Sequence, residues 1–333
     1  MLQSRLRFEC ISKGAKSLMD QSATITRPIG VLVMEYGEPA TVDDVEPYLR
    51  GHFGGQTPPA DYVAFLCERC RRVWGGDQGV SGAQQIFTAL AAQFAEPGAL
   101  TYRVVFGARY WHPYIDAALA ELSSEGIEDV VILPLSPFGS HMALRDYQHS
   151  LDRVRAANPA APRMHLIESW PELPGFTATV TANAQVALAR FPAAVRDQVV
   201  GLFIAHSVAE SARKPEDAYR QQVDSSGAQI ATVIGLTSWR SAYYSAEGPG
   251  QWLGPDVLEA IDQMHQEGVR HILAVPVSAT YDNVELSYEL DVRMAERAAA
   301  LGIAYERAAE PNAAPAMIAG LKDLVVETAL RVL

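Results

Sequence analysis

A pattern that occurs twice in the chain limits its possible folds more than any other feature of the sequence. Residues 125–136 (EGIEDVVILPLS) and 267–278 (EGVRHILAVPVS) share a glutamate and glycine, a β-branched residue, an apolar run, a proline, an aliphatic residue and a serine, in the same order. Each pattern follows a segment with helical periodicity, at 114–125 and at 256–267, and carries a glycine where helices commonly end. The repeat therefore predicts two similar halves, in each of which a helix leads into a buried strand.

An apolar strand also opens each predicted half, at 31–36 and at 199–206. Buried strands that alternate with helices indicate parallel sheets covered by helices. We therefore expect an α/β fold of two similar Rossmann-like lobes, each a parallel sheet flanked by helices, with the active cleft between them. The sequence PELPGF at 171–176 interrupts the pattern, so we predict an N-terminal α/β lobe at 28–172 and a C-terminal α/β lobe at 173–333.

The composition excludes several classes of protein. Of the 333 residues, 49% are hydrophobic, which is enough for a full core. The net charge of −12 argues against nucleic acid as a partner, because nucleic acid requires a basic surface. No apolar run approaches the roughly 20 residues of a membrane-spanning helix, so we expect no transmembrane segment. Residues 1–27 are largely polar and lack the apolar core of a secretory signal. We predict a disordered extension there, with an organelle transit peptide as the alternative, and a cytoplasmic protein.

The three cysteines are Cys10, Cys67 and Cys70, too few for a four-thiolate iron–sulfur cluster or zinc site. Cys67 and Cys70 form a CxxC inside a predicted helix at 61–74, without a second pair. We interpret them as packing residues of a protein from a reducing compartment. No iron–sulfur cluster and no permanently bound cofactor are expected.

Three carboxylates follow the second copy of the repeat. After the apolar run at 271–277, Asp282, Glu285 and Glu289 have the spacing that places side chains on one face of a helix. A carboxylate stripe just past a buried strand lies where open α/β sheets bind ligands. Asp282 and Glu285 also fit a capping box, with aspartate at the N-cap and glutamate at the third helical position. The spacing alone leaves both interpretations open.

Residues from both halves should meet at the predicted cleft. Tyr36 and Ser136 follow strands of the first half, and His206 and Ser278 follow strands of the second. A histidine at a strand end is often a core residue, but here it shares the cleft with Glu285. Imidazole and carboxylate suit a borderline divalent metal such as Fe²⁺, and they also accept protons from a substrate nitrogen. Two such ligands would hold a metal only transiently.

Other motifs and aromatic residues add less. The sequence contains no GxGxxG, Walker A, HExxH or GxSxG motif, which disfavours nucleotide enzymes and serine hydrolases. Tyr243, Tyr244 and Trp252 would either line a flat apolar ligand or pack in the core.

A series of short motifs, taken in order, resembles those of ferrochelatases, specifically the coproporphyrin type of Gram-positive and related bacteria. The resemblance extends from about residue 29 to residue 333. Its motifs are VMEYGEP at 33–39, GG and VS at 75–76 and 80–81, ESW at 168–170, AHS at 205–207, WLGPDV at 252–257, and VPV at 275–277 followed by DNVE at 282–285.

The resemblance implies a chelatase-like fold and the insertion of Fe²⁺, as a substrate, into a porphyrin with release of two pyrrole protons. His206 and Glu285 match the family's metal-handling and proton-accepting pair. Tyr36 matches an axial ligand of the product iron; protoporphyrin-type relatives usually carry methionine there, so coproporphyrin III is the expected substrate. A monomer acting on coproporphyrin III and ferrous iron, in haem biosynthesis, is expected.

The resemblance also implies secondary roles. Positions that contact the substrate in the family are matched by Arg69, Ser81 and Tyr147. The acidic face of Asp282, Glu285 and Glu289 would guide the cation into the cleft.

The chain departs from the family pattern at several places. Glu35 and Glu38 replace small residues beside Tyr36. The family's AHSLP is AHSVA at 205–209, and its SDHxE is YDNVE at 281–285. An arginine-rich loop, RRGRKP in the family, is FGGQTP at 53–58, which removes the obvious partners of substrate propionates.

Three alternatives stay open. The first is a related tetrapyrrole chelatase that uses protoporphyrin IX, cobalt or nickel, since the ligand types would change little. The second is a non-catalytic porphyrin or haem-binding protein, which would need no proton acceptor such as His206 or Glu285. The third, a bilobal periplasmic-type binding protein, is disfavoured because no secretory signal precedes the first lobe.

Overall fold

The computed structural model describes residues 27–98, 100–212, 218–246 and 250–332. The predicted N-terminal extension lies outside the described residues except for Arg27.

The first half forms a four-stranded parallel sheet with the strand order β2-β1-β3-β4. Its strands are β1 (Ile29–Glu35), β2 (Tyr102–Ala108), β3 (Asp129–Pro134) and β4 (Arg163–Leu166). Every residue of the central strands β1 and β3 is buried, as expected of a parallel sheet covered on both faces.

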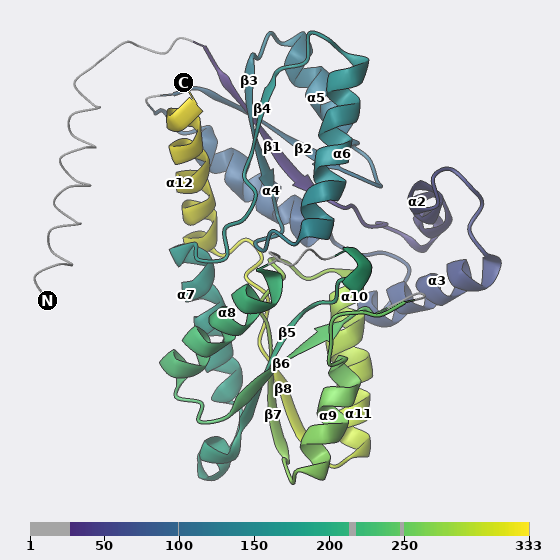
Figure 1. The fold of residues 1–333 in the computed structure, drawn as a ribbon, viewed down its shortest axis with the longest axis vertical. Coiled ribbons are helices and arrows are strands. Elements are labelled where there is room, and N and C mark those ends of the chain that lie inside the picture. Colours follow the sequence, from purple (N-terminus) through teal and green to yellow (C-terminus); the bar gives the residue numbers. More distant parts are fainter. Residues whose placement is uncertain (1–26, 99, 213–217, 247–249, 333) are drawn as a thin grey trace, which may run out of the picture.

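The second half repeats this arrangement in the order β6-β5-β7-β8, again with all strands parallel. Its strands are β5 (Val200–His206), β6 (Trp239–Tyr244), β7 (His271–Pro276) and β8 (Ala304–Arg307). Figure 1 shows the two sheets in separate lobes, the first in the upper and the second in the lower half of the view, each flanked by helices. The predicted α/β fold of two similar Rossmann-like lobes is therefore confirmed.

The repeated sequence produces equivalent local structure. Helix α5 (Ile115–Ser124) leads into β3, and helix α9 (Val257–Gln266) leads into β7. Gly126 (φ +76°) and Gly268 (φ +90°) adopt the left-handed conformation that ends both helices and favours glycine.

The remaining helices form the outer layers. They are α2 (Val45–His52), α3 (Ala60–Trp74), α4 (Gly82–Phe94), α6 (His141–Ala157), α7 (Pro174–Leu188), α8 (Tyr219–Ile234), α10 (Val284–Ser287), a π-helix (Tyr288–Met294), α11 (Ala295–Ala300) and α12 (Pro315–Val332), with short 3₁₀ turns at Val42–Asp44, Ala193–Gln198 and Glu210–Ala212. Within the described ranges, no helix is long and apolar enough to cross a membrane.

The last helix of the chain returns to the first sheet. Figure 1 shows α12, in yellow, alongside that sheet, and it packs against both α4 and α7. The crossing with α7 is close, because a Cβ atom on Gly175 would lie 2.1 Å from the carbonyl oxygen of Ala316. One core cluster runs from Ile29 to Ala329 and joins the two halves. The predicted boundary between residues 172 and 173 stays a prediction.

The predicted capping box at Asp282 is wrong. Helix α10 begins at Val284, and its N-cap is Asn283, whose side-chain oxygen accepts a hydrogen bond from the amide of Leu286 at 3.0 Å. The carboxylate of Asp282 instead accepts hydrogen bonds from Arg307 (2.9 Å) and Asn312 (2.8 Å). Because its carboxylate binds Arg307 and Asn312, Asp282 does not cap the helix.

Candidate active site

A cavity of about 840 Å³ lies where the carboxyl ends of strands from both sheets face each other. The structure brings Tyr36, Ser136, His206 and Ser278 together in its wall, with Glu285 from the start of α10. Parallel strands place their carboxyl ends at one edge of a sheet, so residues that follow them share this space.

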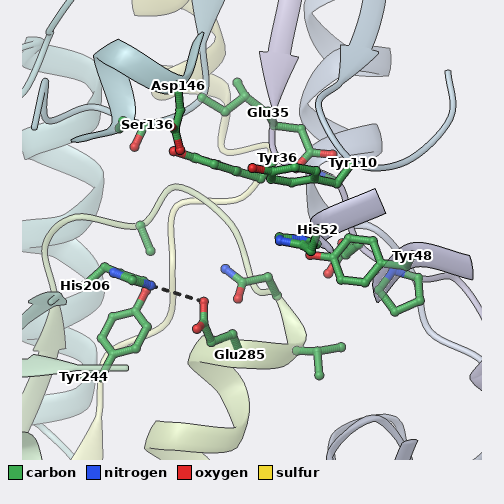
Figure 2. Close-up of a pocket in the computed structure, with 18 of the residues that line it drawn as sticks. Glu35, Tyr36, Tyr48, His52, Tyr110, Ser136, Asp146, His206, Tyr244 and Glu285 are labelled. Carbon is green, nitrogen blue, oxygen red and sulfur yellow. Dashed lines mark hydrogen bonds and ion pairs between the residues drawn. The ribbon is translucent and has the colours of Figure 1, made fainter. Parts of the chain in front are cut away.

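His206 and Glu285 form the most distinctive pair in the cavity. The Nε2 atom of His206 lies 3.5 Å from a carboxylate oxygen of Glu285, as Figure 2 shows with a dashed line. The Nδ1 atom of His206 lies 2.5 Å from the carbonyl oxygen of Ser207. A carbonyl oxygen only accepts, so Nδ1 carries the proton and donates, which leaves Nε2 to face the cavity.

The Glu285 carboxylate is kept ionised by its neighbours. Burial alone would raise its pKa, but the adjacent His206 and the hydroxyl of Ser245, which donates a hydrogen bond to Glu285, lower that pKa to about 2. A charged carboxylate beside an imidazole can hold a divalent cation or stabilise a protonated imidazole. No group of three or more His, Cys, Asp or Glu side chains that could hold a metal ion exists among the residues that the structure describes.

Aromatic rings form the opposite wall. Figure 2 shows Tyr36 and Tyr110 across the cavity from His206 and Glu285. The ring of Tyr36 lies 6.0 Å from that of Tyr110 and 5.2 Å from that of Tyr147, which is almost fully buried. Burial, with the charge of Asp146, raises the pKa of Tyr36, so its hydroxyl is neutral without a bound cation.

His52 completes this aromatic wall. Its ring stacks on Tyr110 with centroids 3.8 Å apart, and it also contacts the ring of Tyr48. Desolvation lowers the pKa of His52 to about 4, so the imidazole is neutral at pH 7. Sequence reasoning missed these three residues. Tyr110 had a usable signal, because it follows the carboxyl end of β2 as Tyr36 follows β1.

Two of the other three predicted substrate contacts line the cavity, and one does not. Arg69 and Tyr147 are in its wall, whereas Ser81 is not and instead caps helix α4. The guanidinium of Arg69 lies over the ring of Tyr288 and 3.6 Å from the carboxylate of Glu289. Arg69 shares this carboxylate with Arg293, which lies closer to it at 2.8 Å.

Of the predicted acidic face, Glu285 alone lines the cavity. Glu289 is buried and paired with Arg293 at 2.8 Å as well as with Arg69, and Asp282 is paired with Arg307. The π-helix that begins at Tyr288 also changes the angular spacing on which the predicted stripe depended.

Comparison with known proteins identifies the family. The sequence model of the family described as Ferrochelatase matches residues 80–329. A ferrochelatase of Herpetosiphon aurantiacus is 34% identical over 296 residues, which cover 89% of this chain and 97% of that protein. The chain belongs to the ferrochelatase family.

Further relatives support both the sequence and the fold assignment. A coproporphyrin III ferrochelatase of Mycolicibacterium smegmatis is 29% identical over 303 residues, covering 89% of this chain and 88% of that protein. The solved structure of the sirohydrochlorin chelatase SirB from Bacillus subtilis, in complex with cobalt, matches with a TM-score of 0.55 at 12% identity, over 91% of this chain and 96% of that chain. At this identity the structural likeness shows the chelatase-like fold alone.

The cavity of this ferrochelatase-family protein is rich in acidic side chains. Five carboxyl groups line it, from Glu35, Glu38, Asp61, Asp146 and Glu285. Among the described residues that line the cavity, Arg69 is the single lysine or arginine. The ionised members of this lining attract cations, and the lining offers few charged partners for a substrate carboxylate. Glu38 adds little negative charge at pH 7, because burial and the charge of Glu35 raise its pKa to about 8.

Proposed function

We propose that this protein inserts ferrous iron into coproporphyrin III, as a step of haem biosynthesis, and releases two pyrrole protons. The observation that carries the proposal is the His206–Glu285 pair, 3.5 Å apart, opposite Tyr36 in one cavity. Membership of the ferrochelatase family and the relatives named coproporphyrin III ferrochelatase support it.

The proposed reaction uses the two walls of the cavity differently. The porphyrin lies flat between the aromatic wall and the His206–Glu285 pair. Fe²⁺, as a substrate, exchanges part of its water for His206 Nε2 and the Glu285 carboxylate, and then passes to the four porphyrin nitrogens. Each pyrrole N–H bond breaks as an iron–nitrogen bond forms. The imidazole of His206, released by the iron, accepts the two protons in turn and passes them to solvent, while the ionised carboxylate of Glu285 stabilises the imidazolium.

Tyr36 supports the choice of porphyrin. We propose that its hydroxyl oxygen is the axial ligand of the product iron, on the face opposite His206. The large positive charge of the iron would offset the burial that raises the pKa of Tyr36. Arg69 and Tyr147, and less directly Ser81, are proposed substrate contacts. That Asp282 and Glu289 help to guide the cation into the cavity stays a prediction.

A second candidate is favoured by the acidic lining of the cavity. Phe53 stands in the wall where the family carries arginines, and Asp61 and Asp146 add carboxyl groups there. A porphyrin with fewer carboxylates, such as protoporphyrin IX, would meet less repulsion there. Cobalt or nickel in place of iron would use the same His206–Glu285 pair.

Other properties of the chain stay predictions. We predict a cytoplasmic monomer that takes Fe²⁺ as a substrate and has no permanently bound cofactor and no iron–sulfur cluster. A non-catalytic porphyrin or haem-binding protein on this scaffold is the alternative from another functional class.

The test is an anaerobic assay with purified protein, Fe²⁺ and either coproporphyrin III or protoporphyrin IX, followed by loss of the free-base absorption bands. Faster metallation of coproporphyrin III supports the proposal. Metallation of protoporphyrin IX alone would establish the second candidate. Tight binding of both porphyrins without metallation by iron, cobalt or nickel would refute chelatase activity and favour a carrier.

A further inference from the structure

We propose that Glu35 is a positioning residue for metal insertion, because its buried side chain joins the turn that presents Tyr36 to the segment that presents Glu285. The inference rests on the proposed function, which places Tyr36 and Glu285 on opposite faces of the porphyrin. It concerns a residue that replaces a small side chain of the family pattern.

A single oxygen atom of Glu35 makes the connection. Its Oε2 atom accepts a hydrogen bond from the backbone amide of Gly37 at 2.6 Å and another from the hydroxyl of Tyr281 at 3.0 Å. Glu35 is the last residue of β1 in the first sheet, whereas Tyr281 lies in the loop after β7 of the second sheet. One carboxyl group therefore links the two halves of the chain at the cavity.

The first of these hydrogen bonds fixes the turn around Tyr36. Gly37 has φ +98°, and a Cβ atom there would lie 2.8 Å from Cβ of Trp111, so the chain turns sharply against a packed side chain. This turn directs the Gly37 amide back toward the carboxylate of Glu35. Because Tyr36 is the residue between the two partners, its backbone is held at both ends.

The second hydrogen bond acts on the segment that leads to Glu285. The neighbouring hydroxyl of Thr280 donates to the carbonyl oxygen of Leu135 at 2.8 Å, so this loop is attached to the first sheet at two adjacent residues. Asn283 then caps α10, whose second residue is Glu285. The segment from Tyr281 to Glu285 is short, and Tyr281, Asp282 and Asn283 each make a hydrogen bond that fixes it. These bonds limit how far Glu285 can move relative to Tyr36.

A second acidic residue lies at the same junction. Burial and the charge of Glu35 raise the pKa of Glu38 to about 8, and the Ser81 side chain and the backbone N–H of Val284 oppose that rise. These causes place Glu38 near Glu35, near the cap of α4 and near the first residue of α10. The junction therefore consists of acidic side chains from the first half against the start of the helix that carries Glu285.

Such a link matters because both faces of the porphyrin must be engaged at the correct separation. Misplacement of a reacting group by about 1 Å can reduce a rate by about 100-fold. Without the Glu35–Tyr281 hydrogen bond, the Thr280 contact and apolar packing would hold the loop less closely. We expect slower insertion with little change in porphyrin affinity.

The experiment compares Glu35→Ala, Glu35→Gln, Tyr281→Phe and the double variant Glu35→Ala/Tyr281→Phe. Tyr102→Phe is the matched control, because it deletes another buried tyrosine hydroxyl, one that has no hydrogen-bond partner among the described residues and lies outside the cavity wall. Each protein is assayed for its anaerobic metallation rate and for porphyrin affinity by fluorescence quenching. The absorption spectrum of added ferric coproporphyrin, which is sensitive to the axial ligand, is recorded as well.

We expect Glu35→Ala and Tyr281→Phe each to slow metallation by about tenfold or more. The double variant should be no slower than Glu35→Ala alone, because both single substitutions remove the same Glu35–Tyr281 hydrogen bond. Glu35→Gln should keep most of the rate, since its amide oxygen can accept the same two hydrogen bonds. Additive effects, equal losses in Glu35→Gln and Glu35→Ala, or a parallel loss of porphyrin affinity would overturn the inference.

If the protein without substitutions inserts no metal, the proposed function is refuted. The absorption spectrum of bound ferric coproporphyrin then still tests whether the Glu35–Tyr281 hydrogen bond positions Tyr36. A shifted spectrum of bound ferric coproporphyrin in Glu35→Ala and Tyr281→Phe, but not in Tyr102→Phe, would support positioning of Tyr36. An unshifted spectrum in both variants would overturn it.

Discussion

The imidazole of His206 and the carboxylate of Glu285 lie 3.5 Å apart, and each is held by a further hydrogen bond of its own. The Ser207 carbonyl fixes the tautomer of His206, and the Ser245 hydroxyl orients Glu285. The pair is therefore arranged before any substrate binds, which is how enzymes avoid reorganisation during the reaction. His206 ends β5, and Glu285 lies at the start of α10, which follows the neighbouring strand β7, so the two meet at the carboxyl edge of the second sheet.

Replacing His206 by alanine should abolish most metal insertion while leaving porphyrin binding intact. The expected loss of rate is about 100-fold or more, because a proton acceptor and a metal ligand disappear together. The measurement is the anaerobic metallation rate beside the porphyrin dissociation constant. Ser241→Ala, which removes a hydrogen bond to Asp224 outside the cavity wall, is the control. Full activity in His206→Ala would contradict the assignment.

Tyr36→Phe should change the product rather than the binding of the free porphyrin. The phenylalanine ring keeps the contacts with Tyr110 and Tyr147 but removes the oxygen that would reach the iron. We expect porphyrin affinity within about threefold of the original, because ring contacts dominate such binding. The absorption spectrum of the bound ferric product should shift. An identical spectrum would show that Tyr36 is not an axial ligand.

The two-lobe fold was predictable because its signals are local and occur twice. The glycines at 126 and 268 end equivalent helices, and an apolar strand follows each of them. The return of α12 to the first sheet was not predictable in this way. Helical periodicity shows that one face of a helix is buried, but it does not show which partner covers it.

The candidate site was predictable where side chains directly follow strands, as Tyr36 and His206 do. The partners of the other predicted acidic residues were harder to find. Asn283 and Asp282 are both good capping residues, so local sequence alone could not decide between them. The pairing of Glu289 with Arg293 had a signal, since the two are four residues apart, a spacing that brings helical side chains together.

Gly175→Ala should destabilise the protein strongly. A Cβ atom at this position would lie 2.1 Å from the backbone carbonyl oxygen of Ala316, so α7 and α12 would have to separate. Forced overpacking of this kind costs about 1–3 kcal/mol or more. Gly76→Ala is the matched control, because a Cβ atom there meets no atom of the described part of the chain within 4 Å. Thermal unfolding of both variants is the measurement, and equal midpoints would contradict the close helix crossing.

Glu38→Gln should stabilise the protein at high pH but not at low pH. Burial and the charge of Glu35 raise the pKa of Glu38 from 4.5 to about 8 in the folded protein. A raised pKa means that folding favours the protonated form, so its contribution to stability is full below pH 4.5 and is lost as the pH rises through 8. A difference of one between the folded and unfolded pKa values changes the free energy of unfolding by up to about 1.4 kcal/mol. Glutamine stays neutral at every pH, so Glu38→Gln does not lose stability as the pH rises in this range.

The measurement is the unfolding midpoint of the original protein and of Glu38→Gln between pH 5 and pH 9. The difference should be small at pH 5 and should grow to roughly 10 °C or more in favour of the variant by pH 9, at about 2–4 °C for each kcal/mol. Glu310, whose pKa burial also raises to about 8, is present in both proteins, so its effect cancels in the difference. A difference that does not change with pH would mean that Glu38 is ionised in the folded protein at neutral pH.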